Sequence, residues 1–292
     1  MKRRELIRYL AAAPLLAGCK REPAAAPSER PIVSAAPASK MPVVFLAHGA
    51  PPLLDDEQWV KQLGDWAGGL PKPKAVLMVS AHWATLPAAI GATTPVPLVY
   101  DFYGFPRRYY EMTYAAPGAP ELAGRVESAL QSASIPFAHL ADRGLDHGAY
   151  VPLMCMYPKA DVPVLQVALP GLDPQAVFDF GRALQPLRDE GVLIIGSGFL
   201  THNLREGFGG GTPQWAKDFD AWAQDRLAQR DVDALIDFRN KAPAAARNHP
   251  TIEHYLPVLL SLGASPGAEK VAFPIDGFWG PTSFTKRSVQ FG

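Results

Sequence analysis

The stretch "VLIIGSGFLTHN" at residues 192 to 203 combines the two features that decide the fold. Its first half is a continuous apolar run, which is typical of a strand buried on both faces of a sheet. Its second half becomes polar and contains a histidine. Two other stretches have the same form, "VVFLAHG" at 43 to 49 and "VLMVSAHW" at 76 to 83. The repeated pattern predicts buried strands that carry imidazole side chains just beyond their carboxyl ends.

From residue 42 onward, short apolar runs alternate with segments of helical periodicity. This alternation predicts an α/β fold, with a central, largely parallel or mixed sheet flanked by helices in a single domain from 41 to 292. The predicted strands are 43 to 47, 75 to 81, 162 to 169, 192 to 198 and 271 to 275. The predicted helices are 56 to 67, 119 to 132, 174 to 188, 213 to 229 and 252 to 262.

The composition is that of an ordinary globular protein. Of its 292 residues, 48% are hydrophobic and 19% are charged, which is enough to build one sizeable core. The 28 Lys and Arg residues balance the 28 Asp and Glu residues. A chain without excess positive charge is a poor candidate for binding nucleic acid through its phosphates, so we expect a small-molecule partner instead.

Residues 1 to 19 have the layout of an export signal rather than of folded structure. A basic start precedes a short apolar stretch and small residues that lead to Cys19. Arg3 and Arg4 resemble a twin-arginine signal, and "LAGC" at 16 to 19 resembles the lipobox of bacterial lipoproteins. The alternative is an amphipathic first helix of the domain. It is disfavoured because the apolar stretch has no polar face.

Residues 20 to 40 are rich in Pro, Ala and Ser and lack apolar periodicity, which predicts a disordered tether. We therefore expect an exported, periplasm-facing protein that meets the inner or outer membrane only through a lipid on Cys19. The chain has 2 cysteines, so Cys155 would then be the single remaining thiol, and no intrachain disulfide could form.

The histidines are concentrated near the ends of the predicted strands. Of the 7 in the chain, His48, His82 and His202 each follow an apolar run closely. In an open α/β sheet, ligands bind in the crevice at the carboxyl ends of the strands, so these side chains predict a site. Any one of them alone would more often be a hydrogen-bonded structural residue. Their long spacing is not that of a short metal-binding motif.

The stretch "GLDHGAY" at 144 to 150 adds His147, with Asp146 beside it. A carboxylate can fix the tautomer of an imidazole and raise its basicity, which suits an acid/base role. Neighbours in an extended chain point in opposite directions, however, so Asp146 could orient another group. His139 lies in a strand-like stretch without small flanking residues, and we interpret it as structural.

The stretch "NHPTIEHYLP" at 248 to 257 contains two more histidines. Thr251 can cap the helix that follows, and Pro257 is tolerated only within the first turns, which places His254 at a helix N-terminus. A neutral imidazole that binds a cation suits that position. His249 precedes a proline and is interpreted as an entry-loop residue outside the site.

Six segments, in this order, resemble the class III extradiol ring-cleavage dioxygenases of the DOPA-dioxygenase type. The resemblance extends from about residue 42 to the C-terminus, nearly the whole predicted domain. The segments are "FLAHGAPPLL", "AVLMVSAHW", "YDFYGFPRRYYEMTYAAPGAPELA", "RGLDHGAYVPLMCMYP", "IIGSGFLTHNLR" and "EHYLPVLLSLGA".

The resemblance implies one non-haem divalent metal that binds a catechol through both hydroxyls and opens the ring with O2. By the same resemblance, His48, His82 and His254 are the metal ligands. His202 is an acid/base beside the metal, or a fourth ligand in members that hold zinc. His147 then faces the substrate.

The same resemblance assigns Asp101, Phe102 and Phe105 of "YDFYGFP" to the mouth of the substrate pocket. Aromatic side chains there can sandwich the catechol ring.

The metal is the least determined part of the prediction. Fe(II) is expected for activity, but its commonest ligand set is two histidines and one carboxylate, whereas Glu253 here is only the neighbour of His254. The family often has Ser where Ala50 stands, which removes a possible hydrogen bond near the metal. Three imidazoles also suit zinc, which has no redox chemistry.

Two other functions therefore stay open. One is a zinc-dependent hydrolase that lowers the pKa of a bound water. The other is a non-catalytic metal-binding lipoprotein, although the presence of all four family histidines argues against it. The sequence leaves open the identity of the catechol, the bond that is cleaved and the oligomeric state.

Overall fold

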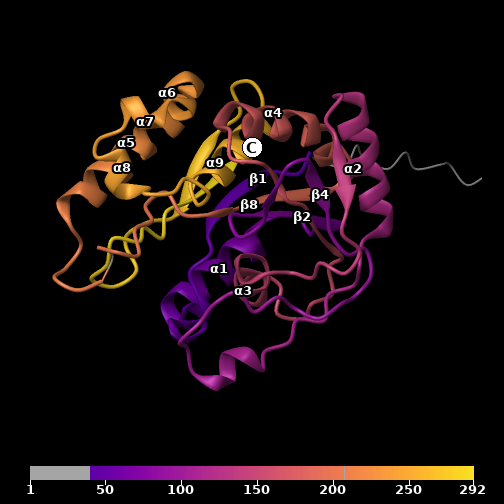
Figure 1. The fold of residues 1–292 in the computed structure, drawn as a ribbon, viewed down its shortest axis with the longest axis horizontal. Coiled ribbons are helices and arrows are strands. Elements are labelled where there is room, and N and C mark those ends of the chain that lie inside the picture. The colour runs from indigo at the N-terminus through magenta and orange to yellow at the C-terminus, as the bar shows by residue number, and fades with distance from the viewer. Residues whose placement is uncertain (1–39, 207) are drawn as a thin grey trace, which may run out of the picture. The chain divides into compact units, whose positions relative to one another are not determined.

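The computed structural model describes residues 40–206 and 208–292, and the predicted export signal and nearly all of the predicted tether lie outside that part of the chain. Its centre is a mixed sheet of six strands (Figure 1). The first four strands in the order below run parallel to one another, the fifth runs antiparallel to both of its neighbours, and the sixth therefore runs in the direction of the first four. The order is β6 (Val164–Gln166), β2 (Ala75–Ser80), β8 (Val192–Gly198), β1 (Val43–Ala47), β10 (Ser288–Phe291) and β9 (Val271–Ile275).

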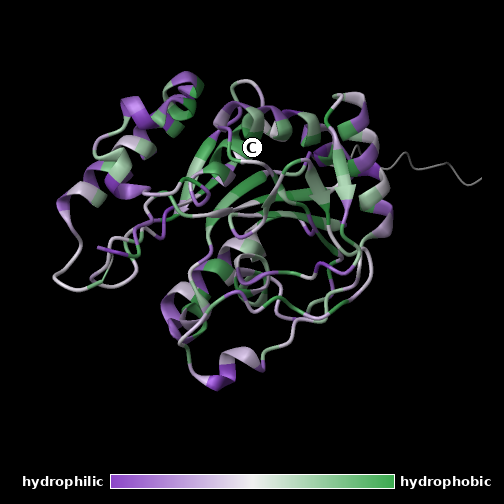
Figure 2. Ribbon diagram, viewed as in Figure 1, coloured by the Kyte–Doolittle hydropathy of each residue, from purple (hydrophilic) through white to green (hydrophobic). Residues whose placement is uncertain are grey.

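Helices cover both faces of this sheet (Figure 1). One face packs against α2 (Pro120–Ser132), α4 (Pro174–Leu184) and α9 (Leu256–Gly263). The other packs against α1 (Glu57–Gly69) and α3 (His147–Met156). The central strands are buried on both sides, which explains why their sequences are continuously apolar rather than alternating (Figure 2).

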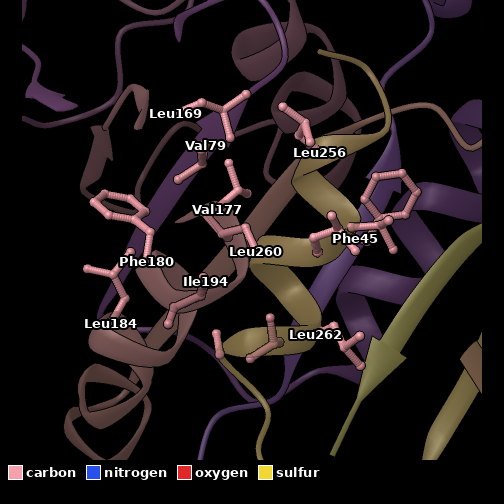
Figure 3. Close-up of a cluster of buried hydrophobic side chains, with 14 of the residues drawn as sticks. Phe45, Val79, Leu169, Val177, Phe180, Leu184, Ile194, Leu256, Leu260 and Leu262 are labelled. Carbon is pink, nitrogen blue, oxygen red and sulfur yellow. The ribbon is translucent and has the colours of Figure 1, made fainter. Parts of the chain in front are cut away.

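Alternate residues of each central strand belong to different halves of the core. Phe45, Val79 and Ile194 point toward α4 and α9, where they meet Phe180 and Leu260 (Figure 3). Their neighbours along the strands point toward α1 and α3. This alternation follows from the pleat of a strand, and it fixes which residues at the strand ends can face a common site.

The remaining elements are one long helix, α5, and several short helices and strands. The other helices are α5 (Gln214–Gln229), α6 (Val232–Ile236), α7 (Phe238–Lys241) and α8 (Ala245–Asn248). Three 3-10 helices are η1 (Pro51–Asp55), η2 (Arg107–Tyr110) and η3 (Gln185–Glu190). Two small sheets pair β3 (Ala84–Thr85) with β7 (Leu169–Pro170) and β4 (Ala88–Ile90) with β5 (Phe137–His139). No helix in the described part of the chain is long and apolar enough to cross a membrane.

The predicted fold class is confirmed, and so are the central strands, but the sequence-based assignment missed α3. The segment around His147 was treated as extended, whereas His147 is the first residue of this helix and Asp146 precedes it. The helix is buried on nearly all sides, so its sequence shows no polar face from which helical periodicity could be read.

The helix of the last predicted segment begins later than expected. It starts at Leu256, and Thr251 donates a hydrogen bond to Glu253 instead of capping it. Pro257 does lie in the first turn, where its missing N–H costs nothing. His254 therefore lies in the turn that leads into α9.

Candidate active site

Imidazoles from three separate segments meet at the carboxyl ends of the parallel strands. His48 follows β1 directly and His82 lies two residues beyond β2. Their Nε2 atoms are 3.2 Å apart, and the Nε2 of His254 is 3.3 Å from that of His82. The structure thus brings together the three residues that the family resemblance named as metal ligands.

Two glycines allow these segments to approach so closely. A Cβ at Gly198, the last residue of β8, would collide with the carbonyl oxygen of His254. The next residue, Phe199, donates its N–H to that same oxygen at 2.8 Å. A Cβ at Gly148 in α3 would likewise collide with the hydroxyl of Ser80 at the end of β2. The small residues beside the histidines therefore serve close backbone packing.

Each of the three imidazoles has a protein partner on its other ring nitrogen. His48 Nδ1 lies 3.0 Å from Ser197 Oγ, whose own proton is donated to the carbonyl of Gly148. His82 Nδ1 lies 3.3 Å from Asp101 Oδ2. His254 Nδ1 lies 3.1 Å from Glu253 Oε1. Acceptors at Nδ1 place the proton there, so each Nε2 presents a lone pair to the common centre.

Burial keeps these imidazoles neutral. It is the largest cause, ahead of the neighbouring imidazoles, that lowers the pKa values of His48, His82 and His254 below the usual range. Unprotonated Nε2 atoms that face one another cannot form a hydrogen bond, and their lone pairs repel. A cation between them removes that conflict. His48, His82 and His254 are the residues that would hold such a cation.

His202 is held in a different way. Its ring stacks on that of His254, with centroids 3.6 Å apart and an interplanar angle of 8°. Phe199 and Phe284 flank it, at 5.7 and 5.5 Å between centroids. Within the described residues, no protein group hydrogen-bonds to either ring nitrogen, and only its backbone N–H is bonded, to the carbonyl of Asn248. Burial, followed by the effect of His147, lowers the pKa of His202 to about 4.

Asp101 joins two histidines of the site. Its Oδ1 accepts hydrogen bonds from Nδ1 and the backbone N–H of His147, at 2.8 and 3.1 Å, and its Oδ2 faces His82. Burial alone would raise the pKa of Asp101, but the hydrogen bonds that it accepts from His147 outweigh burial and hold the pKa below its usual range. Phe102 meets the ring of His147 edge-on, and Phe105 packs behind Phe102.

Several residues of the site could not be identified from the sequence. Ser197 and Glu253 hold imidazoles, and Phe199 and Phe284 pack against each other and against His202. The only signals were that Ser197 and Phe199 lie in the same strand-end stretch as His202, and that Glu253 precedes His254.

Three residues lie outside the cluster. Asp146 does not contact the His147 ring; it is buried and its Oδ2 bonds Gln166 and Arg143. His139 is away from the other histidines, with 53% of its side chain exposed. His249 is fully buried rather than part of an exposed entry loop.

Comparison with known proteins gives one consistent result. The family described as the catalytic LigB subunit of aromatic ring-opening dioxygenase matches residues 39–278. A 4,5-DOPA dioxygenase extradiol of Beta vulgaris is 40% identical, covering 85% of this chain and 95% of its own length. One from Escherichia coli K12 is 36% identical, covering 87% and 96%.

A solved structure supports the same conclusion at the level of the fold. An uncharacterized protein from Escherichia coli K12 superposes with a TM-score of 0.73 at 33% identity, covering 86% of this chain and 100% of that one. The fold, the cluster of histidines and the extent of these matches agree. The chain belongs to the family of the catalytic LigB subunit of aromatic ring-opening dioxygenase, which confirms the predicted family and the predicted extradiol dioxygenase function.

Proposed function

We propose that this enzyme opens the ring of a DOPA-like or phenolic-acid catechol with O2 at an Fe(II) held by His48, His82 and His254. The observation that carries the proposal is the convergence of three neutral Nε2 atoms on one point. Fe(II) held there would supply positive charge that favours the ionised catechol and the redox chemistry that the reaction with O2 needs. The choice of catechol is supported by relatives whose names specify DOPA.

His202 is proposed as the acid/base rather than as a fourth ligand. A histidine that binds a metal almost always donates its other ring N–H to a partner, as the three proposed ligands do here. His202 has no such partner in the described residues and is neutral because it is buried. A neutral imidazole beside the metal can take a proton from the catechol hydroxyl and return it later.

His147 is proposed to orient the substrate. Its Nδ1 proton is donated to Asp101, so its Nε2 remains as a hydrogen-bond acceptor for a substrate hydroxyl. Asp101 then acts through His147 and His82. Phe102 beside His147, and Phe199 beside His48, are proposed to provide aromatic surfaces for the ring.

The function can be tested on the purified full chain. Its metal would be measured and removed, Fe(II) would be restored without oxygen, and O2 uptake would be followed with DOPA, caffeate and protocatechuate. We expect uptake to increase in proportion to the bound iron, and a zinc-loaded sample serves as the inactive control because zinc has no redox chemistry. Stoichiometric tight zinc with no uptake on any catechol would instead favour the zinc-dependent hydrolase.

We also propose that the enzyme is exported and anchored by a lipid on Cys19. The support is the twin arginine pair and the "LAGC" stretch, both before the family match, which begins at residue 39. Cys19→Ser should release the protein into the soluble fraction, with Cys155→Ser as the control because that thiol is buried in the domain. Unchanged membrane association of Cys19→Ser would contradict lipidation there.

A further inference from the structure

We propose that His249 is a positioning residue for the reaction: it fixes the backbone beside His202, so that the His202 ring presents its nitrogens to the substrate. The inference rests on the proposed acid/base role of His202. In the part of the chain that the structure describes, His249 forms no hydrogen bond with the ring nitrogens of the site. It would act through the chain segment that carries His202.

The need for such a residue follows from how His202 is held. The other histidines of the site are oriented by Ser197, Asp101 or Glu253 at Nδ1. Among the described residues, the His202 ring is held by stacking and by flanking aromatic side chains alone, which restrain the ring plane but not its position along that plane. Its position must therefore be fixed through its backbone.

Three hydrogen bonds join the segment 247 to 249 to the segment 200 to 203, which carries His202. His249 Nε2 donates to the carbonyl of Leu200 at 2.8 Å. The N–H of His202 donates to the carbonyl of Asn248 at 3.2 Å. Asn203 Nδ2 donates to the carbonyl of Arg247 at 2.6 Å. The first two bonds hold the backbone two residues before His202 and at His202, and the third holds the side chain of the next residue, so the stretch is tied to this segment on both sides of His202.

His249 is itself held in one orientation. It is 0% exposed, and its ring packs between Phe219, Phe238 and Tyr255, with centroids 5.3, 5.9 and 5.4 Å away. Burial lowers its pKa to about 3, so the ring is neutral and carries one proton. Because Nε2 faces a carbonyl oxygen, the proton lies there. The Nδ1 atom of His249 has no partner in the described residues. The hydrogen bond to Leu200 is therefore the polar interaction that this ring makes there.

Two variants of His249 distinguish the effect of losing the hydrogen bond from the effect of losing the volume of the ring. His249→Leu removes the donor, and His249→Gln restores an N–H at a similar reach. The matched control is Tyr255→Phe, which removes another buried donor from the same aromatic cluster, a hydroxyl that bonds the carbonyl of Leu235 at 3.0 Å. That bond leads to α6 and not to the segment of His202.

We expect His249→Leu to lower kcat by roughly 10- to 100-fold, with bound iron and KM little changed. His249→Gln should recover most of the loss, and Tyr255→Phe should retain the wild-type kcat. Equal losses in His249→Leu and Tyr255→Phe would show that general loosening of the core is responsible, and would overturn the proposal. So would a His249→Gln variant as impaired as His249→Leu.

A double variant tests whether His249 acts through His202. Once His202→Ala has removed the acid/base, adding His249→Leu should cause no further loss of kcat. A second loss of full size would overturn the proposal. If His202→Ala alone retains turnover, His202 is not the acid/base. This outcome tests the proposed function separately, because the single variant leaves His249 unchanged.

A third measurement does not depend on activity. In zinc-loaded protein with ¹⁵N-labelled histidine, the ring signals that are absent from His202→Ala identify His202. These signals should shift or broaden in His249→Leu and stay in place in Tyr255→Phe. Unchanged His202 signals in His249→Leu would overturn the positioning role, even if His202 proves to be the acid/base.

Discussion

The two sides of this histidine cluster are built on different principles. His48, His82 and His254 each have Nδ1 bonded to a hydroxyl or a carboxylate, so the direction of every Nε2 lone pair is fixed. His202 is positioned by stacking and by its backbone, and its ring nitrogens are left without protein partners in the described residues. A metal ligand benefits from a fixed lone pair, whereas an acid/base must exchange its proton freely.

The largest expected effect is on the side with the bonded Nδ1 atoms. His254→Ala should abolish metal retention and reduce O2 uptake to background, because only two imidazoles remain at the centre. Bound metal would be measured by elemental analysis after gel filtration. The control is His139→Ala on β5, since that side chain is 53% exposed and outside the cluster. A His254→Ala protein that keeps one metal per chain would show that Glu253 or His202 is the third ligand.

Replacing the residue on the other side should separate metal binding from turnover. His202→Ala should keep the metal and lose roughly 10²- to 10⁴-fold in kcat, which is the usual contribution of an acid/base. Metal content and kcat would be measured on the same sample. If metal and activity fall together, as expected for His254→Ala, then His202 is a fourth ligand and the contrast between the two sides disappears.

A smaller effect is expected from a residue that touches neither metal nor substrate. Ser197→Ala removes the acceptor at His48 Nδ1, and we expect metal affinity to fall by roughly 10- to 100-fold. Competition with a chelator would measure it. Ser283→Ala is a matched control, because the buried Ser283 hydroxyl has no partner in the described residues. Equal affinity in both variants would mean that packing alone orients His48.

Much of the fold was predictable because its signals are local. The strands β1, β2 and β8 are continuous apolar runs, and the histidines that follow them are visible in the same stretches. Parallel neighbours in a sheet bring their carboxyl ends together, so a shared site followed from that rule. The helix α3 was not predictable in this way, since almost every residue from His147 to Met156 is buried and no periodic polar face remains.

The parts of the site that were missed depend on contacts between distant segments. Phe284 reaches His202 from a loop about eighty residues further along the chain, and nothing in the local sequence marks it. His249 was interpreted as a bystander because its neighbour is a proline and its flanks suggest a loop. Its burial and its bond to Leu200 depend on α5, α7 and β8 packing around it. Local pattern reveals which residues end a strand, but not which carbonyl a buried side chain will meet.

The smallest expected effect concerns how His202 is kept neutral. In the metal-free protein, burial lowers its pKa to about 4, whereas in the unfolded chain it should be about 6.5. Between these values the unfolded chain binds a proton that the folded chain does not, so acidification destabilises the folded state. His202→Phe removes this contribution. Between about pH 7.5 and about pH 6, the free energy of unfolding should therefore fall by about 0.8 kcal/mol less in the variant than in the wild type.

Urea unfolding with a chelator present would measure this difference, and His139→Phe is the control at an exposed position. The ring of the introduced phenylalanine can occupy the space between Phe199 and Phe284, so the two proteins differ mainly in whether a proton can be bound. Identical pH dependence in wild type and His202→Phe would mean that His202 is protonated in the folded state at about pH 6. Burial would then not be what keeps His202 neutral, and the contrast between the fixed metal-binding side and the proton-exchanging side would lose that support.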